Sequence, residues 1–233
     1  MKKKYLTSLL TMAILATGGG NAQAQTDVTS TYIVNPGFEL STGETGDVTS
    51  GKTATNSKDY TETGWKNTNT AAWSCSAVVT YGSGKIAGVG SPDADNTGNA
   101  GNALGISVGW KGTVTYQSAS TITLPAGTYT LAVNAYNANS ATTFNSKFGF
   151  VPTSGTAYLS SKTSFTTNQW TTDAVTFTLN EATEGVIQIG GQANNNAGSG
   201  SHAKLFLDNI TLTKEKDQVI KDGTYYLYDA SSK

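Results

Sequence analysis

The stretch that decides the fold of this chain reads YTLAVNAY over residues 129–136. Side chains of a β-strand point to opposite faces in turn, so alternate positions share a face. Counted from Tyr129, every second residue of this run is apolar or aromatic and predicts a buried face. The residues between them, which include Asn134 and Tyr136, predict a face turned to solvent or to a ligand.

Similar short runs recur along the chain, whereas helical periodicity is nearly absent. Turn residues separate them, as in Pro125-Ala126-Gly127. Many short strands at this spacing are typical of an antiparallel β-sandwich or barrel, so we expect an all-β fold. The other expected strands are 32–34, 77–81, 103–108, 114–117, 121–124, 147–151, 156–159, 174–179, 185–189 and 204–212.

Two segments at opposite ends of this region place a carboxylate among apolar residues: NPGFEL (35–40) and LFLDNITL (205–212). By alternation, the residues Phe206, Asp208, Ile210 and Leu212 share one face. A carboxylate in such surroundings is costly unless it is neutralised, and the chain contains no arginine. Carboxylate and carbonyl oxygens suit calcium.

The sequence therefore predicts a structural calcium bound by Glu39 and Asp208, with Asn35 as a further ligand or as a turn former. Two other interpretations stay open: Asp208 caps a turn, and Glu39 lies exposed at a strand edge. DADNTG (93–98) begins like an EF-hand loop, but Leu104 stands where the loop requires a glutamate. A polar turn is the better interpretation of that motif.

These motifs also carry a resemblance. Asn35-Pro36-Gly37-Phe38-Glu39, Gly64-Trp65, LPAGTY (124–129) and the closing Leu-Asp-Asn-Ile resemble, in order and spacing, the galactose-binding-like jelly rolls. Such domains serve as carbohydrate-binding modules of secreted bacterial, Bacteroidetes-like, multidomain proteins. The resemblance covers residues 32–214. It implies a jelly-roll β-sandwich, a structural calcium near the paired chain ends, and glycan binding.

The first 24 residues have the pattern of a signal peptide: three lysines, a short apolar core and an Ala-Gln-Ala cleavage site before Gln25. The apolar core is too short for a transmembrane segment, and no cysteine follows for a lipid anchor. We expect export to the periplasm, cell surface or medium. We assign 25–31 to a short leader, 32–214 to the β-sandwich, and 215–233 to a linker and the truncated start of a following β domain.

Composition argues against several classes of function. Removing Lys2, Lys3 and Lys4 takes the formal net charge from −1 to −4, and no basic patch suggests nucleic acid as a partner. The single Cys75 forms no internal disulfide and is expected as a small buried residue. His202 is the only histidine, so a histidine-dependent nucleophile or a zinc site has too few residues. We therefore expect an accessory module without catalytic activity of its own.

Sugar recognition needs an exposed aromatic ring and polar groups beside it. Trp65 and Trp170 are expected in the core. The expected ligand-binding residues are Trp110, Trp73, Tyr136, Asn134 and Asn195, with Trp110 in a Gly-flanked turn as the leading candidate. The function expected is a carbohydrate-binding module for a polysaccharide or glycoprotein glycan, joined to further domains of the same polypeptide. The alternatives are a structural or adhesive spacer without sugar binding, and a small glycosidase with two carboxylates facing one cleft.

Overall fold

The computed structural model describes residues 24–49, 61–68, 74–109, 111–139, 144–193 and 202–216. Nearly all of its regular elements are strands, with one helical turn, α1 (Thr29–Tyr32). The strands are β1 (Gln25–Asp27), β2 (Asp47–Val48), β3 (Thr61–Glu62), β4 (Trp65–Asn67), β5 (Cys75–Thr80), β6 (Lys85–Ile86), β7 (Val89–Gly90), β8 (Asn102–Val108), β9 (Thr113–Ser118), β10 (Ile122–Leu124), β11 (Gly127–Asn137), β12 (Phe144–Ser146), β13 (Gly149–Pro152), β14 (Tyr158–Leu159), β15 (Trp170–Leu179), β16 (Thr183–Ala193) and β17 (Ala203–Glu215).

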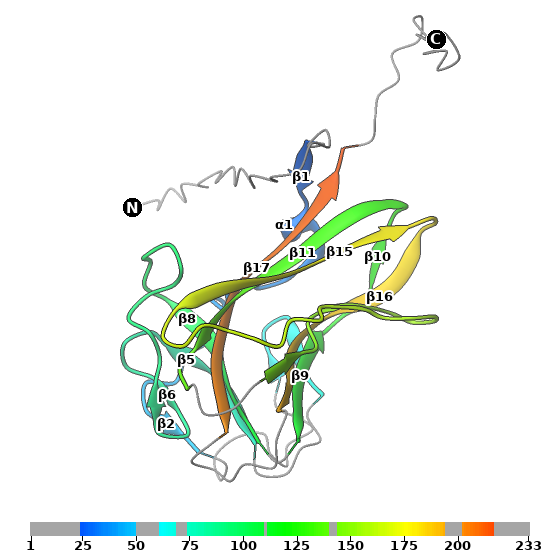
Figure 1. Ribbon diagram of the computed structural model, residues 1–233. Coiled ribbons are helices and arrows are strands. Elements are labelled where there is room, and N and C mark those ends of the chain that lie inside the picture. Colours follow the sequence, from blue (N-terminus) through cyan, green and yellow to red (C-terminus); the bar gives the residue numbers. More distant parts are fainter. Residues whose placement is uncertain are drawn as a thin grey trace, which may run out of the picture.

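Two antiparallel sheets pack face to face in a β-sandwich, which confirms the predicted fold class (Figure 1). The first sheet has the order β15-β11-β17-β8-β5, with β1 added beside β17. The second has the order β14-β13-β16-β9-β4-β3, with β10 and β12 also paired to β16. Within the described ranges, no helix is long and apolar enough to cross a membrane.

The core lies between the two sheets and follows the predicted alternation. The apolar face of β11, from Tyr129 to Ala135, is buried against residues of β16 and β13. Trp65 is fully buried, as expected, and its indole nitrogen donates to the Asn35 carbonyl oxygen at 3.0 Å. The Ser76 hydroxyl on β5 and the Tyr116 hydroxyl on β9 form a polar contact between the sheets at 2.8 Å.

The outer face of the first sheet is covered over only part of its area. A small third sheet, β2-β6-β7, lies over β5 and β8 and closes a second apolar cluster. Figure 1 shows this cover at the lower left, away from β15 and the far end of β11. The two parts of this outer face therefore have different surroundings.

The chain ends are paired more closely than the sequence suggested. Gln25–Asp27, assigned above to a leader, forms β1 and pairs antiparallel with the end of β17. Residues 32–34, predicted as a strand, instead lie at and after the end of α1. The pairing of β1 is a long-range contact between strands about 190 residues apart, and a three-residue polar segment gives no local pattern that predicts it.

Candidate functional site

The candidate site lies on the outer face of the first sheet and is built around Asp208 of β17. Asp208 is 2% exposed. Its Oδ2 accepts a hydrogen bond from the Tyr81 hydroxyl at 2.5 Å, and its Oδ1 accepts one from the Asn209 backbone N–H at 2.6 Å. Asp208 is also the cross-strand partner of Asn134 on β11. Two residues predicted for separate roles, metal and ligand binding, thus lie side by side.

A β-bulge orients Asp208, and it corrects one prediction. The pairing of β17 with β11 shifts register between Asn134 and Ala132, and Asn209 takes a φ of 50°. The extra residue reverses the alternation. Phe206 and Asp208 therefore point outward, whereas Ile210 and Leu212 point into the sandwich core; the prediction that all four share one face is wrong.

Glu39 reaches the same place from the segment that opens the domain. A Cβ atom placed on Gly37 would lie 3.4 Å from Asp208 Oδ1 and 3.9 Å from Glu39 Cγ. Glu39 is exposed, and its Oε1 accepts a hydrogen bond from the Asn102 backbone N–H at 2.9 Å. Glu39 and Asp208, which are about 170 residues apart in sequence, therefore both lie near Gly37.

The hydrogen bonds of the Asn35 side chain are those of a turn former. Its amide nitrogen donates to Ser41 Oγ and to the Thr63 carbonyl, and its Oδ1 accepts from the Leu40 N–H at 2.9 Å. Asn35 has a φ of 57°, which asparagine tolerates better than most residues. These contacts match the turn-forming role that the sequence left open, and its role as a metal ligand stays a prediction.

The loop of residues 91–101 closes over this corner. Asp95 Oδ1 accepts backbone N–H bonds from Thr97 and Asn99, so the motif at 93–98 forms a polar turn. Asp95 Oδ2 accepts a 3.1 Å bond from the Asn209 side chain, which the bulge directs toward the loop. Three carboxylates, of Glu39, Asp95 and Asp208, thus surround one corner of the domain.

Burial controls the electrostatics of the corner. Burial raises the pKa of Asp208 to about 7; the bonds from Tyr81 and Asn209 oppose the shift, and the charges of Glu39 and Asp95 add to it. Burial and the Asp208 charge likewise raise the pKa of Tyr81. The negative charges of Glu39 and Asp95 therefore favour the protonated form of Asp208.

A calcium ion fits these residues in part. Glu39 and Asp208 both lie near Gly37, and calcium takes carbonyl and amide oxygens as further ligands. The described residues contain no group of three or more Asp, Glu, His or Cys side chains placed to hold a metal ion. A calcium at this corner would therefore rely on Glu39, Asp208 and backbone oxygens, and it would compete with Tyr81 for Asp208.

Aromatic rings adjoin the carboxylates. The Tyr81 ring meets Trp170 edge-on at 6.3 Å between centroids, and Trp170 meets Tyr136 at 5.6 Å. Trp170, expected in the core, is half-buried at the start of β15, and its indole nitrogen donates to the Ala94 carbonyl oxygen at 3.2 Å. Asn134 accepts a 2.8 Å bond from the Thr172 hydroxyl. Tyr136 and Trp170 are half-buried against the second apolar cluster, next to the buried Asn134 amide and the Thr172 hydroxyl.

Three of the predicted ligand-binding residues, Trp73, Trp110 and Asn195, lie outside the described residues. Of the glycines near position 110, the Gly112 N–H donates to the Gly109 carbonyl oxygen at 2.7 Å. Cys75 is buried beneath β2, and burial raises the pKa of its thiol to about 11. The prediction of a buried cysteine is confirmed.

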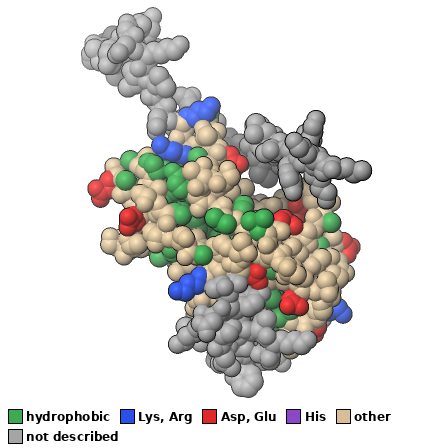
Figure 2. Space-filling view, turned by 180° about the vertical axis from the view of Figure 1, so that it is seen from behind, with side chains coloured by type: hydrophobic (Ala, Val, Ile, Leu, Met, Phe, Trp, Pro, Cys, Tyr) green, Lys and Arg blue, Asp and Glu red, His purple; other side chains and the backbone are tan. Residues whose placement is uncertain are grey.

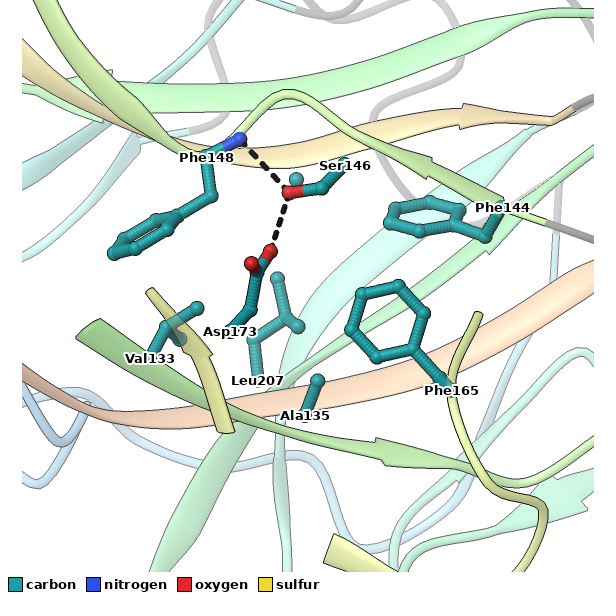
Figure 3. A pocket seen from close by; sticks show the side chains of 9 residues that line it. Val133, Ala135, Phe144, Ser146, Phe148, Phe165, Asp173 and Leu207 are labelled. Carbon is teal, nitrogen blue, oxygen red and sulfur yellow. Dashed lines mark hydrogen bonds between the residues drawn. The ribbon is translucent and has the colours of Figure 1, made fainter. Parts of the chain in front are cut away.

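The sequence reading missed a second buried carboxylate, Asp173 of β15, which lies between the sheets (Figure 3). It accepts hydrogen bonds from the Ser146 and Ser160 hydroxyls, both at 2.5 Å. Each serine oxygen in turn accepts a backbone N–H, from Phe148 and Lys162 respectively. Burial raises the pKa of Asp173, while the two serine hydroxyls act in the opposite direction. Strand alternation places Asp173 on the same face as the apolar Phe177, as it placed Asp208 among apolar residues. Asp173 was nevertheless missed, because the strand was predicted to begin at residue 174.

Asp173 borders a small cavity lined by Phe144, Phe148 and Phe165 together with aliphatic residues of β11 and β17 (Figure 3). The cavity measures about 10 Å³, which is close to the room that one water molecule needs. It is too small for a sugar ring. The arrangement ties segments 146–148 and 160–162 together and is a structural brace.

Comparison with known proteins supports the fold and leaves the activity open. No protein-family model matches the chain, and no curated protein matches it. A Stig cyclase from Fischerella sp. TAU is similar in structure with a TM-score of 0.50 and 16% identity, over 84% of this chain and 100% of the cyclase. The carbohydrate-binding module TmCBM61, solved with β-1,4-galactotriose, has a TM-score of 0.42 and 14% identity, over 79% and 98%. The CBM22-1–GH10 modules of xylanase 10B from Clostridium thermocellum, solved with xylohexaose, have a TM-score of 0.44 and 11% identity, over 79% and 29%. At these identities the likeness concerns the β-sandwich fold alone.

Proposed function

We propose that this chain is a non-catalytic carbohydrate-binding module of an exported protein. The observation that carries the proposal is the pair of half-buried rings of Tyr136 and Trp170, which lie beside the Asn134 amide and the Thr172 hydroxyl. An aromatic ring packs on the apolar face of a pyranose, while amides and hydroxyls bond the sugar hydroxyls. Trp110, Trp73 and Asn195 remain proposed contributors. The signal-peptide pattern supports export, and the jelly-roll resemblance supports a glycan as ligand.

A glycan array with the purified chain tests this proposal. Wild type is expected to bind a defined set of glycans, and Tyr136→Ala is expected to lose about tenfold or more in affinity, since one ring contact is removed. Tyr158→Ala is the matched control, because Tyr158 is also half-buried but lies on β14 of the second sheet. Equal binding by wild type and Tyr136→Ala would move the site elsewhere. No binding by folded wild type would reject the function.

The proposed calcium would be held by Glu39 and Asp208 and would stabilise the corner that supports Tyr81 and Trp170. Metal that binds only the native state raises the melting temperature by mass action. EDTA is therefore expected to lower the melting temperature and calcium to restore it. Asp208→Ala should remove this response. An unchanged melting temperature in both solutions would reject the calcium.

A second function has one observation in its favour. Beyond the aromatic rings, the outer face of β11 and β15 carries small threonine and alanine side chains, a composition that suits a structural or adhesive spacer. The array separates the two functions. A spacer binds no glycan.

A further inference from the structure

The part of the outer face that β2-β6-β7 leaves uncovered has an unusual composition. Nine consecutive outward positions on three adjacent strands hold only threonine or alanine, and we call them the threonine face. Its members are Thr128, Thr130 and Ala132 on β11, Thr172, Ala174, Thr176 and Thr178 on β15, and Thr211 and Thr213 on β17.

Cross-strand contacts hold this face in a regular array. The hydroxyls of Thr130 and Thr176 lie 2.9 Å apart, and those of Thr128 and Thr178 lie 3.1 Å apart. Strand geometry spaces such pairs by about 4.8 Å across strands and about 6.7 Å along them. Because threonine is β-branched, its χ1 rotation is restricted. Each hydroxyl keeps bonding capacity beyond its cross-strand contact, since an O–H offers one donor and two lone pairs.

The array is open to solvent. All four β15 members are exposed, and Thr128, Thr130 and Ala132 are half-exposed. The short side chains form a low surface that is bounded at one end by the rings of Trp170 and Tyr136. A ligand lying on this face could therefore continue onto the proposed aromatic site without crossing a buried element.

Charge restricts the kind of ligand. None of the nine positions is ionisable, and the chain has no arginine and a formal net charge of −1. Figure 2, a view from behind, likewise shows Lys, Asp and Glu side chains scattered over a surface that is mostly neither charged nor hydrophobic. A polyanion would meet no cation on the threonine face, whereas hydroxyl and methyl groups match the hydroxyl and C–H groups of a neutral sugar.

We propose that the threonine face binds a neutral, extended glycan chain, which runs along β15 and β11 from the aromatic rings of Trp170 and Tyr136. The inference rests on the proposed carbohydrate-binding function and deepens it. It assigns the class of ligand, an uncharged polysaccharide bound along its length, and it adds threonine hydroxyls to the aromatic contact. Affinity should then rise with chain length, because successive sugars find the same spaced hydroxyl pairs.

Affinity gel electrophoresis of the chain in soluble xylan, galactan and mixed-linkage glucan tests this proposal, with polygalacturonate as the anionic comparison. Thr176→Lys places a long charged side chain in the middle of the face. Thr123→Lys is the matched control, since Thr123 is an exposed strand threonine on β10, which belongs to the second sheet. Retention by at least one neutral polymer is expected to fall about tenfold or more in Thr176→Lys and to stay unchanged in Thr123→Lys. Hexasaccharides of that polymer should bind more tightly than its disaccharides.

The outcomes separate this inference from the proposed function. If Thr176→Lys is retained like wild type, or if disaccharides bind as well as hexasaccharides, the threonine face is rejected while the carbohydrate-binding function stands. Stronger retention by polygalacturonate would reject the neutral ligand. If neither the gels nor the array show any glycan binding by folded protein, both proposals fail and the spacer function takes their place.

Discussion

Asp173 and Asp208 are both 2% exposed, and both lie in long strands of the same sheet, yet their surroundings differ. Asp173 points into the sandwich and is held by two serine hydroxyls. Asp208 points outward and shares its corner with Glu39 and Asp95. A carboxylate inside the core needs its donors built in, because water is excluded. At the outer face, Asp208 also has two donors, Tyr81 and Asn209, but the charges of Glu39 and Asp95 act on it as well.

The largest expected effect is on Asp173. Asp173→Ala leaves two buried serine hydroxyls without their acceptor and enlarges the cavity beside Phe148, so we expect the unfolding free energy to fall by about 3 kcal/mol. Denaturant unfolding measures this. Asp208→Ala, compared in EDTA, should cost less because it also relieves repulsion with Glu39 and Asp95. If Asp208→Ala lowered the unfolding free energy more than Asp173→Ala, the distinction between a structural role for Asp173 and a binding role for Asp208 would be wrong.

Tyr81→Phe tests the surroundings of Asp208 by removing one of its hydrogen-bond donors. It removes a buried hydrogen bond to a carboxylate, and we expect a loss of about 2 kcal/mol in EDTA. Tyr116→Phe is the matched control, because the Tyr116 hydroxyl is also buried but meets the neutral Ser76 hydroxyl. That control should cost about 1 kcal/mol. Equal losses would mean that the Asp208 charge adds nothing to the bond.

Asp208 should also make stability depend on pH in EDTA. Its folded pKa of about 7 lies above the ordinary value of 3.8, so the native state binds the proton more tightly than the unfolded chain does. Stability therefore falls as the pH rises from about 4 to about 7. Asp208→Asn does not titrate, so it should be more stable than wild type at pH 8 and equal to it below pH 4. Thermal melts at both pH values test the sign, and a wild type that is the more stable at pH 8 contradicts it.

The smallest effect is expected at the bulge. Asn209→Ala puts alanine, which disfavours positive φ, at a position with a φ of 50°, and it removes the hydrogen bonds to Asp95 and Asn96. We expect the free energy of unfolding to fall by about 1 kcal/mol. Asn209→Gly loses the same bonds without the backbone strain. Chemical unfolding should therefore show that Asn209→Gly is more stable than Asn209→Ala. The reverse order would show that backbone conformation does not hold the bulge in place.

Strand alternation predicted much of this protein. The run 129–136 assigned the two faces of β11 correctly, and most long strands were placed within a few residues. The short strands β2, β3, β6, β7 and β12 were missed, because two or three residues carry no readable period. Asp173 was missed because its strand was predicted to begin at residue 174, whereas it begins at Trp170.

The sequence by itself determined the sandwich class and the burial of Cys75, and it led us to expect that two carboxylate segments lie close together. These conclusions were possible because strand alternation, composition and the absence of arginine can be read from the chain alone. Only the tertiary structure decided which way Asp208 points, since one bulge residue reverses a strand's faces. It also decided that Trp170 is only half-buried and packs beside Tyr136 against the second apolar cluster, and that β1 pairs with β17. Each of these depends on contacts between residues distant in sequence, and no local pattern encodes them.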